Sequence, residues 1–208
     1  FFNEDIHLLF YFLFLLIIFF VFLNFENNFS ELFLSLTSSI SNVGFSLNDS
    51  SNNLSFIFLI LVIIGGSFFS TSSGIRFLKI YSLFKYSINE ILSYSRPKNI
   101  YINKHLFSKD SFKLDEIYKY FLSVIVFIIS LLILTFLLTL SGIDFESSFK
   151  LSILTLMNTV NSSMFGLSDF SFYDLHFMTK YYLIFFMIVG RLELLTLLII
   201  CKKFLFKS

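Results

Sequence analysis

The sequence feature that most constrains this chain is a ten-residue stretch, Gly65 to Gly74, between two apolar runs. It contains three glycines and five hydroxyl residues. The apolar run before it, Leu54 to Ile64, rises about 1.5 Å per residue as a helix, so it reaches only about halfway across a hydrocarbon core of roughly 30 Å. The stretch is therefore expected deep in a membrane, where glycine and hydroxyl residues weaken a helix.

Two structures fit such a stretch. One is a serine-rich helix with a kink at Gly65-Gly66. The other is a re-entrant element in a transport pathway, because non-helical backbone at this depth is tolerated only when it is buried in protein or lines a wet cavity.

The composition restricts the chain to the polytopic membrane proteins. Of its 208 residues, 56% are hydrophobic and 33 are phenylalanine. No basic block with interleaved aromatic residues indicates nucleic-acid binding. The three histidines match no metal-ligand spacing, and no catalytic constellation of Ser/His/Asp, Cys/His or paired carboxylates indicates an enzyme. We therefore expect neither an enzyme nor a bound cofactor.

Hydropathy predicts four membrane helices. The outer helix of each repeat covers 8–23 and 120–140. The inner helix of each repeat covers 54–84, with a break at 65–74, and 180–201. The apolar segments 29–40 and 145–157 are too short to span a membrane, so we expect two short re-entrant helices. Nine of the fifteen basic residues fall between 76 and 119, which places this connection in the cytoplasm by the positive-inside rule.

The order of helix, short helix, loop and broken helix occurs twice. A shift of 117 residues pairs Ser41-Asn42-Val43-Gly44 with Asn158-Thr159-Val160-Asn161. Both copies run from the outside to the inside in the same sense, so the repeats are parallel. We expect an all-α integral membrane protein of the pore-loop cation channel type, with repeats over 1–91 and 117–208 and a cytoplasmic linker over 92–116.

A cation filter is the chemistry that this arrangement favours. A dehydrated alkali cation needs several oxygen ligands that still let it leave. We expect the backbone carbonyls of the two paired loops to bind K⁺, with the negative C-terminal ends of both short helices directed toward the ion. The filter residues expected are Ser41, Asn42, Val43, Gly44, Asn158, Thr159, Val160 and Asn161.

Arg191 and Glu193 interrupt the last span. A charge at mid-membrane costs about 2.5 to 3.5 kcal/mol on insertion scales, and residues two apart on a helix do not face each other. Each therefore needs a partner elsewhere. Arg191 has five donors that suit the exposed carbonyls of the 65–74 loop, which makes it a candidate gate partner; an ion pair within the helix bundle is the structural alternative.

These residues resemble a known family. The stretch from Gly65 to Arg76 is similar to the intramembrane loop of TrkH/KtrB-type potassium transporters, and Gly190-Arg191-Leu192-Glu193, with Met187 before it, is similar to the family's M-x-x-GRLE signature. The two paired loops resemble the third and fourth filter loops. The resemblance covers nearly the whole chain and corresponds to the C-terminal half of the family, its third and fourth membrane–pore–membrane repeats.

The resemblance implies potassium uptake across a bacterial inner membrane by a homodimer that works with a cytoplasmic nucleotide-binding regulatory subunit of the TrkA/KtrA type. It also implies that the glycine-rich loop obstructs the pore below the filter and that Arg191 helps to position it. The gate-loop residues carried over are Gly65, Gly66, Ser67, Ser70, Thr71 and Gly74.

The chain departs from the family pattern at two places. Asn161 stands where the family has glycine, and the loop carries Phe68 and Phe69 where small residues are usual. Three alternatives stay open: a less selective K⁺/Na⁺ transporter, a degenerate subunit that does not conduct, and a tandem potassium channel, although neither loop reads Thr-Val-Gly-Tyr-Gly.

Overall fold

The computed structural model describes residues 9–17, 20, 29–45, 52–65, 75–94, 114–159, 165–167, 171–173, 175–191 and 203. Residues 9–17 are helical, and six longer helices follow in order along the chain. These are α2 (Phe29–Ile40), α3 (Asn52–Ile63), α4 (Phe77–Tyr94), α5 (Leu114–Leu140), α6 (Phe145–Met157) and α7 (Phe177–Arg191).

Two very short strands separate α3 from α4. β1 (Ile64–Gly65) pairs in parallel with β2 (Ile75–Arg76), and Ile64 lies opposite Ile75. The all-α fold expected from the sequence did not include this pair of strands. It forms because Gly65 ends the apolar helix and the β-branched Ile64 and Ile75 suit extended backbone. α3 thus ends at Ile63 and α4 begins at Phe77, on either side of the stretch where a break was expected.

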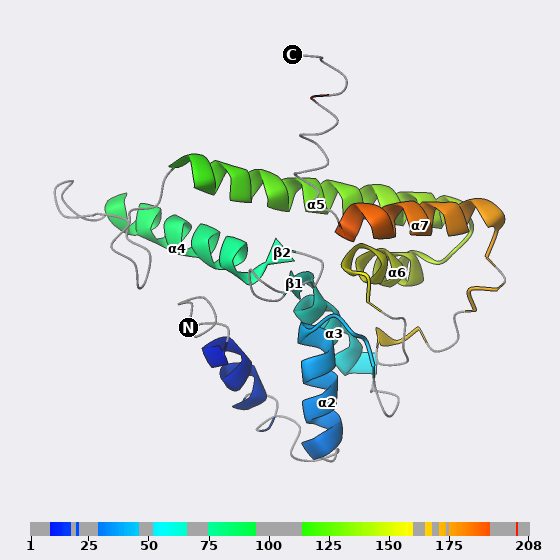
Figure 1. The fold of residues 1–208 in the computed structure, drawn as a ribbon, viewed down its shortest axis with the longest axis horizontal. Helices are drawn as coiled ribbons and strands as arrows, with labels where there is room; N and C mark the ends of the chain where they lie inside the picture. The colour runs from blue at the N-terminus through cyan, green and yellow to red at the C-terminus, as the bar shows by residue number, and fades with distance from the viewer. Residues whose placement is uncertain are drawn as a thin grey trace.

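The short helix α6 lies at the centre of the packing. It contacts α5, α7 and α3, whereas α2 packs against α3, and α4 packs along α5 (Figure 1). In its C-terminal half every residue from Leu151 to Met157 is buried. The core around α6 is completed by fully buried side chains of α5, α3 and the 165–167 segment, namely Leu134, Leu138, Val62 and Phe165.

Three buried hydroxyl groups of α5 and α6 bond to their own helix. Ser152 Oγ donates to the carbonyl of Ser148 at 2.7 Å, and Thr155 Oγ1 donates to the carbonyl of Leu151 at 2.6 Å. Thr135 in α5 repeats the pattern, donating to the carbonyl of Leu131 at 2.8 Å. Because each donor turns back onto its own helix, these serines and threonines can be buried among apolar side chains without an interhelical partner.

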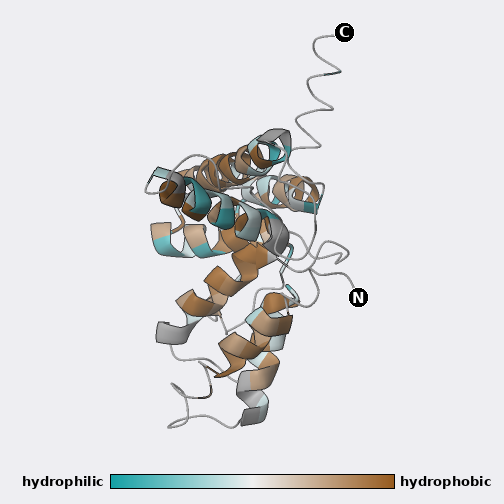
Figure 2. Cartoon of the chain, turned by 90° about the vertical axis from the view of Figure 1, so that its left-hand side faces the viewer, coloured by the Kyte–Doolittle hydropathy of each residue, from teal (hydrophilic) through white to brown (hydrophobic). Residues whose placement is uncertain are grey.

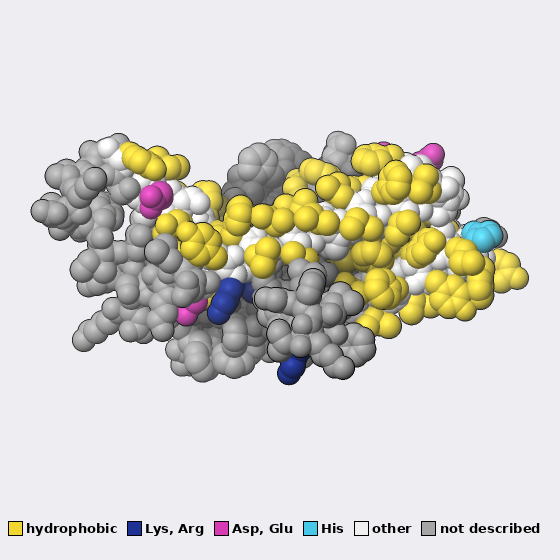
Figure 3. Space-filling view, turned by 90° about the horizontal axis from the view of Figure 1, so that it is seen from above, with side chains coloured by type: hydrophobic (Ala, Val, Ile, Leu, Met, Phe, Trp, Pro, Cys, Tyr) yellow, Lys and Arg dark blue, Asp and Glu magenta, His cyan; other side chains and the backbone are white. Residues whose placement is uncertain are grey.

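The outer surface of the helices is apolar. Figure 2 shows hydrophobic residues along most of their length, and Figure 3 shows an extended hydrophobic face with few charged side chains. On α5 this face includes Leu132 and Phe136, which are 58% and 64% exposed. Within the described ranges, Glu116–Leu140 is the helix whose length and composition suit a membrane crossing.

Two helices run further than their hydropathy predicts. α4 continues past residue 84 to Tyr94, and α5 begins at Leu114 and not at residue 120. The added N-terminal residues of α5 include Asp115 and Glu116. Their negative charges stabilise the start of a helix, because the helix N-terminus carries a partial positive charge. The structure therefore places parts of the expected 92–116 linker in helices. α2 and α6 occupy the same residues as the two expected short helices.

Candidate functional site

The C-terminal end of α2 is closed by a left-handed turn at Asn42. This residue has φ of 58°, and the amide of Val43 donates back to the carbonyl of Ser38 at 3.0 Å. Asparagine tolerates this conformation better than other residues with a side chain. Gly44 also has positive φ, 79°, and the amide of Phe45 donates to Ser38 Oγ at 2.6 Å. The residues of the expected first filter segment therefore form a hydrogen-bonded cap at the end of α2.

The end of α6 has the same construction. Asn158 is left-handed, with φ of 54°, and its amide donates to the carbonyls of Leu154 and Thr155. The amide of Thr159 donates to the carbonyl of Leu154 at 3.0 Å. Both caps satisfy the last carbonyls of a helix that ends inside the protein.

The two caps match with a shift of 116 residues. Asn42 corresponds to Asn158, and Ser38 corresponds to Leu154, by their hydrogen bonds. The sequence pairing used a shift of 117, which aligns the last helical residues, Ile40 and Met157. The difference arises because an asparagine directly follows α6, whereas Ser41 stands between α2 and its asparagine.

The cap residues differ in their exposure. Asn42 and Gly44 are buried, whereas Ser41 and Val43 are exposed. In the second segment Thr159 is 5% exposed, and its hydroxyl oxygen has no hydrogen-bond partner in the described part of the chain. Val160 and Asn161 lie outside the described residues. The described ranges hold no group of three His, Cys, Asp or Glu that suits a metal ion. Backbone and hydroxyl oxygens are therefore the ligands that the described cap residues could offer a cation.

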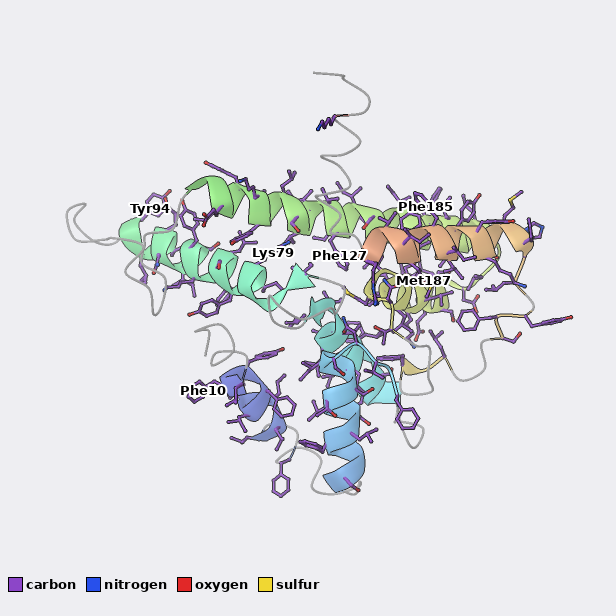
Figure 4. All side chains as sticks on the ribbon, viewed as in Figure 1. Phe10, Lys79, Tyr94, Phe127, Phe185 and Met187 are labelled. Atoms are coloured by element: carbon purple, nitrogen blue, oxygen red, sulfur yellow. The ribbon has the colours of Figure 1, made fainter. Side chains whose placement is uncertain are left out.

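The second cap is tied to α7 at two points. Asn158 Nδ2 donates to the carbonyl of Met187 at 3.0 Å, and Figure 4 shows Met187 on α7 beside α6. One turn further along, a Cβ on Gly190 would lie 2.1 Å from the carbonyl oxygen of Leu156. The two backbones therefore touch where α6 ends, and only glycine fits at that crossing.

A third anchor lies beyond the second filter segment. Phe165 is fully buried and Leu167 is 5% exposed, and Gly166 between them has φ of 70°. A Cβ on Gly166 would lie 3.2 Å from Lys150 Nζ, which itself lies 2.6 Å from Glu146 Oε1. That hydrogen bond from the ammonium group lowers the pKa of the Glu146 carboxyl. Sequence reasoning missed this anchor, although a Phe-Gly-Leu triplet within a polar loop was its visible signal.

The gate-loop stretch is described at its two ends. The parallel pair between β1 and β2 joins Gly65 to Arg76 across the strands, so the chain enters and leaves the loop side by side. Gly66, Ser67, Ser70, Thr71 and Gly74 lie outside the described residues. The described ends therefore do not form one continuous helix, because α3 stops at Ile63 and α4 starts at Phe77.

Arg191 is the last residue of α7 and is exposed. No hydrogen bond or ion pair joins its side chain to another residue of the described ranges. Glu193 lies outside these ranges. The contact expected between Arg191 and the gate loop is therefore still a prediction.

Comparison with known proteins agrees with this geometry. The family model described as TrkH, cation transport protein, matches residues 23–206. The chain belongs to the TrkH family. It is thus a member of a family of membrane transport proteins, which confirms the expected family and the expectation that the chain is not an enzyme.

A solved structure shares the fold. The potassium transporter TrkH from Vibrio parahaemolyticus matches with a TM-score of 0.76 and 22% sequence identity. The match covers 93% of this chain and 42% of that protein, so the chain spans less than half of its length. A search of curated proteins gave no match.

The crossing at Gly190 generates a first prediction. Gly190→Ala places a methyl group against the Leu156 carbonyl, so α7 must move away from α6, at a cost of about 1 to 3 kcal/mol. We expect a clear fall in the midpoint of thermal unfolding of the purified protein in detergent. Ile188→Ala, on the exposed side of the same helix, is the matched control. Equal midpoints for the two variants would show that the backbones do not touch.

Proposed function

We propose that this chain forms part of a potassium-conducting pore, in which backbone carbonyls of the two capped segments coordinate the ion and the 65–74 loop obstructs its path. The observation that carries the proposal is the pair of equivalent caps at Asn42 and Asn158. Each cap ends a helix that is too short to span a membrane. Each cap also lies within one of the two expected filter segments, 41–44 and 158–161. Family membership and the shared fold support the same function.

The electrostatics of the caps favour a cation. A helix C-terminus carries a partial negative charge, and two such ends directed toward one ion stabilise it without a carboxylate. The αL residues turn the backbone sharply after each helix, which frees the following carbonyls from helical hydrogen bonds. The buried Thr159 hydroxyl adds a further oxygen beside the second cap.

The remaining parts of the proposal come from the family resemblance. They are a location in the bacterial inner membrane, a homodimer of the full-length protein and a cytoplasmic nucleotide-binding subunit of the TrkA/KtrA type. The chain itself offers the apolar outer face that lipid requires. The basic segment between residues 76 and 119 suits the cytoplasmic side, where such a subunit would bind.

The direct test is complementation. The full-length gene that contains this chain should restore growth of potassium-uptake-deficient cells on low-potassium medium, and rubidium uptake should follow expression. A protein that reaches the membrane and restores neither growth nor uptake would instead be a degenerate subunit, as the asparagine at position 161 allows.

The positive φ of Gly44 makes the filter assignment testable. Gly44→Ala forces a methyl-bearing residue into the left-handed region, which costs about 1 to 2 kcal/mol. If the filter carries this strain, discrimination between K⁺ and Na⁺ falls by about 5- to 30-fold in flux assays.

Gly142→Ala is the matched control for that variant. Gly142 has φ of 88° and nothing within 4 Å of an added Cβ, but it lies in the turn after α5. The same backbone strain at that turn should leave discrimination unchanged. Equal discrimination by wild type and Gly44→Ala would contradict the assignment of residues 41–44 to the filter.

The role of Arg191 gives a further prediction. A hydrogen bond to a charged group contributes about 1.5 to 3 kcal/mol. Arg191→Ala should therefore increase resting K⁺ flux by about tenfold or more, with an unchanged amount of protein in the membrane. Arg191→Lys keeps the charge but loses the forked donors, so its resting K⁺ flux should lie between those of the wild type and Arg191→Ala. Loss of the Arg191→Ala protein from the membrane would indicate a structural ion pair and not a gate contact.

A further inference from the structure

The side chain of Asn158 links two parts of the molecule that are 29 residues apart in sequence. Its backbone forms the cap of α6, and its Nδ2 donates to the carbonyl of Met187 in α7 at 3.0 Å. Most polar side chains on the described short helices bond to their own helix, as Thr155 does with Leu151. Asn158 instead bonds to a neighbouring one.

The acceptor lies close to the end of α7. In a regular helix the carbonyl of Met187 faces the amide four residues further on, which is that of Arg191. A carbonyl oxygen has two lone pairs, so it can accept both donors. The Asn158 bond therefore joins the filter end of α6 to the helical turn that ends at the candidate gate partner.

The crossing at Gly190 places the backbones of the two helices in direct contact. Because a Cβ there would lie 2.1 Å from the Leu156 carbonyl oxygen, the backbones are in contact between Met187 and Arg191. A rotation or shift of α7 in this turn must move the Met187 carbonyl relative to α6. The Asn158 bond would then stretch or break, and the left-handed cap would lose its side-chain support.

We infer that Asn158 is a positioning residue that couples the conformation of the second filter segment to the position of α7 at Arg191. This inference rests on the proposed function for its effect on ions, because it assigns the cap to a filter. The added step is that one hydrogen bond, from Asn158 Nδ2 to the Met187 carbonyl, links the filter segment to the gate partner. Because the Nδ2 group bonds to the Met187 carbonyl, its effect on an ion passes through the backbone of Asn158 and Thr159.

Two substitutions separate the backbone role of Asn158 from its side-chain role. Asn158→Gly keeps the left-handed conformation and removes the donor. Asn158→Asp keeps the shape of the side chain and replaces the donor with an acceptor that repels the Met187 carbonyl. Ser141→Gly is the matched control, because Ser141 Oγ also bonds to a backbone carbonyl at a helix end, that of Leu137. Ser141 precedes α6, whereas Asn158 follows its other end.

The first measurement is K⁺/Na⁺ discrimination by the full-length protein in flux assays. Loss of one neutral hydrogen bond corresponds to a factor of about 2 to 12. We expect Asn158→Gly to reduce discrimination by a factor in this range and Asn158→Asp to reduce it at least as much, whereas Ser141→Gly has no effect. Unchanged discrimination in the Asp variant would overturn the inference, because the donor would then be unnecessary.

The second measurement does not depend on conduction. Hydrogen–deuterium exchange of the amides of Asn158 and Thr159 reports the cap, since both donate to carbonyls of α6. Arg191→Ala should accelerate this exchange in the wild-type background and not in the Asn158→Gly background. Equal acceleration in both backgrounds, or none in wild type, would overturn the coupling. If the wild-type protein carries no K⁺, the proposed function fails and the exchange result alone decides the inference.

Discussion

A helix that ends inside a membrane protein leaves its last carbonyls without helical partners, and no water is available to satisfy them. The structure meets this constraint with one device used twice. An asparagine in the left-handed region turns the chain back, so that the following amide reaches a carbonyl five residues earlier. Everything proposed for ion binding depends on these caps, because they set where the backbone leaves each helix.

The two copies of this device have different surroundings. α6 is enclosed by α3, α5 and α7, and a side chain of its cap reaches α7. α2 contacts α3, and the exposed Val43 and Phe45 follow its cap. The same kind of cap therefore ends α6, inside the described helix bundle, and α2, at the edge of that bundle. In α6 the packing fixes the cap from outside, whereas in α2 the Ser38 hydroxyl fixes it from within.

Much of this arrangement could be predicted from the sequence because membranes impose simple rules. Length and hydropathy located α2 and α6, since a short apolar segment between polar ones has few alternatives. The start of α5 was misplaced because Asp115 and Glu116 are polar, although they favour a helix N-terminus. The one-residue offset between the caps depends on where an asparagine follows the helix. The contacts of Gly190 with Leu156 and of Asn158 with Met187 depend on the crossing of two helices, which a periodic pattern does not specify.

The buried hydroxyl groups of α6 have a consequence for how this helix can change over evolution. Ser148 and Ser152 are fully buried; Ser152 donates to a carbonyl of α6 itself, and Ser148 donates to the carbonyl of Ile143 just before the helix. They offer neighbouring helices little more than the volume of a small residue. This interior is therefore restricted by size and not by polarity: alanine would be a near-equivalent occupant, whereas a single leucine would force the surrounding helices apart.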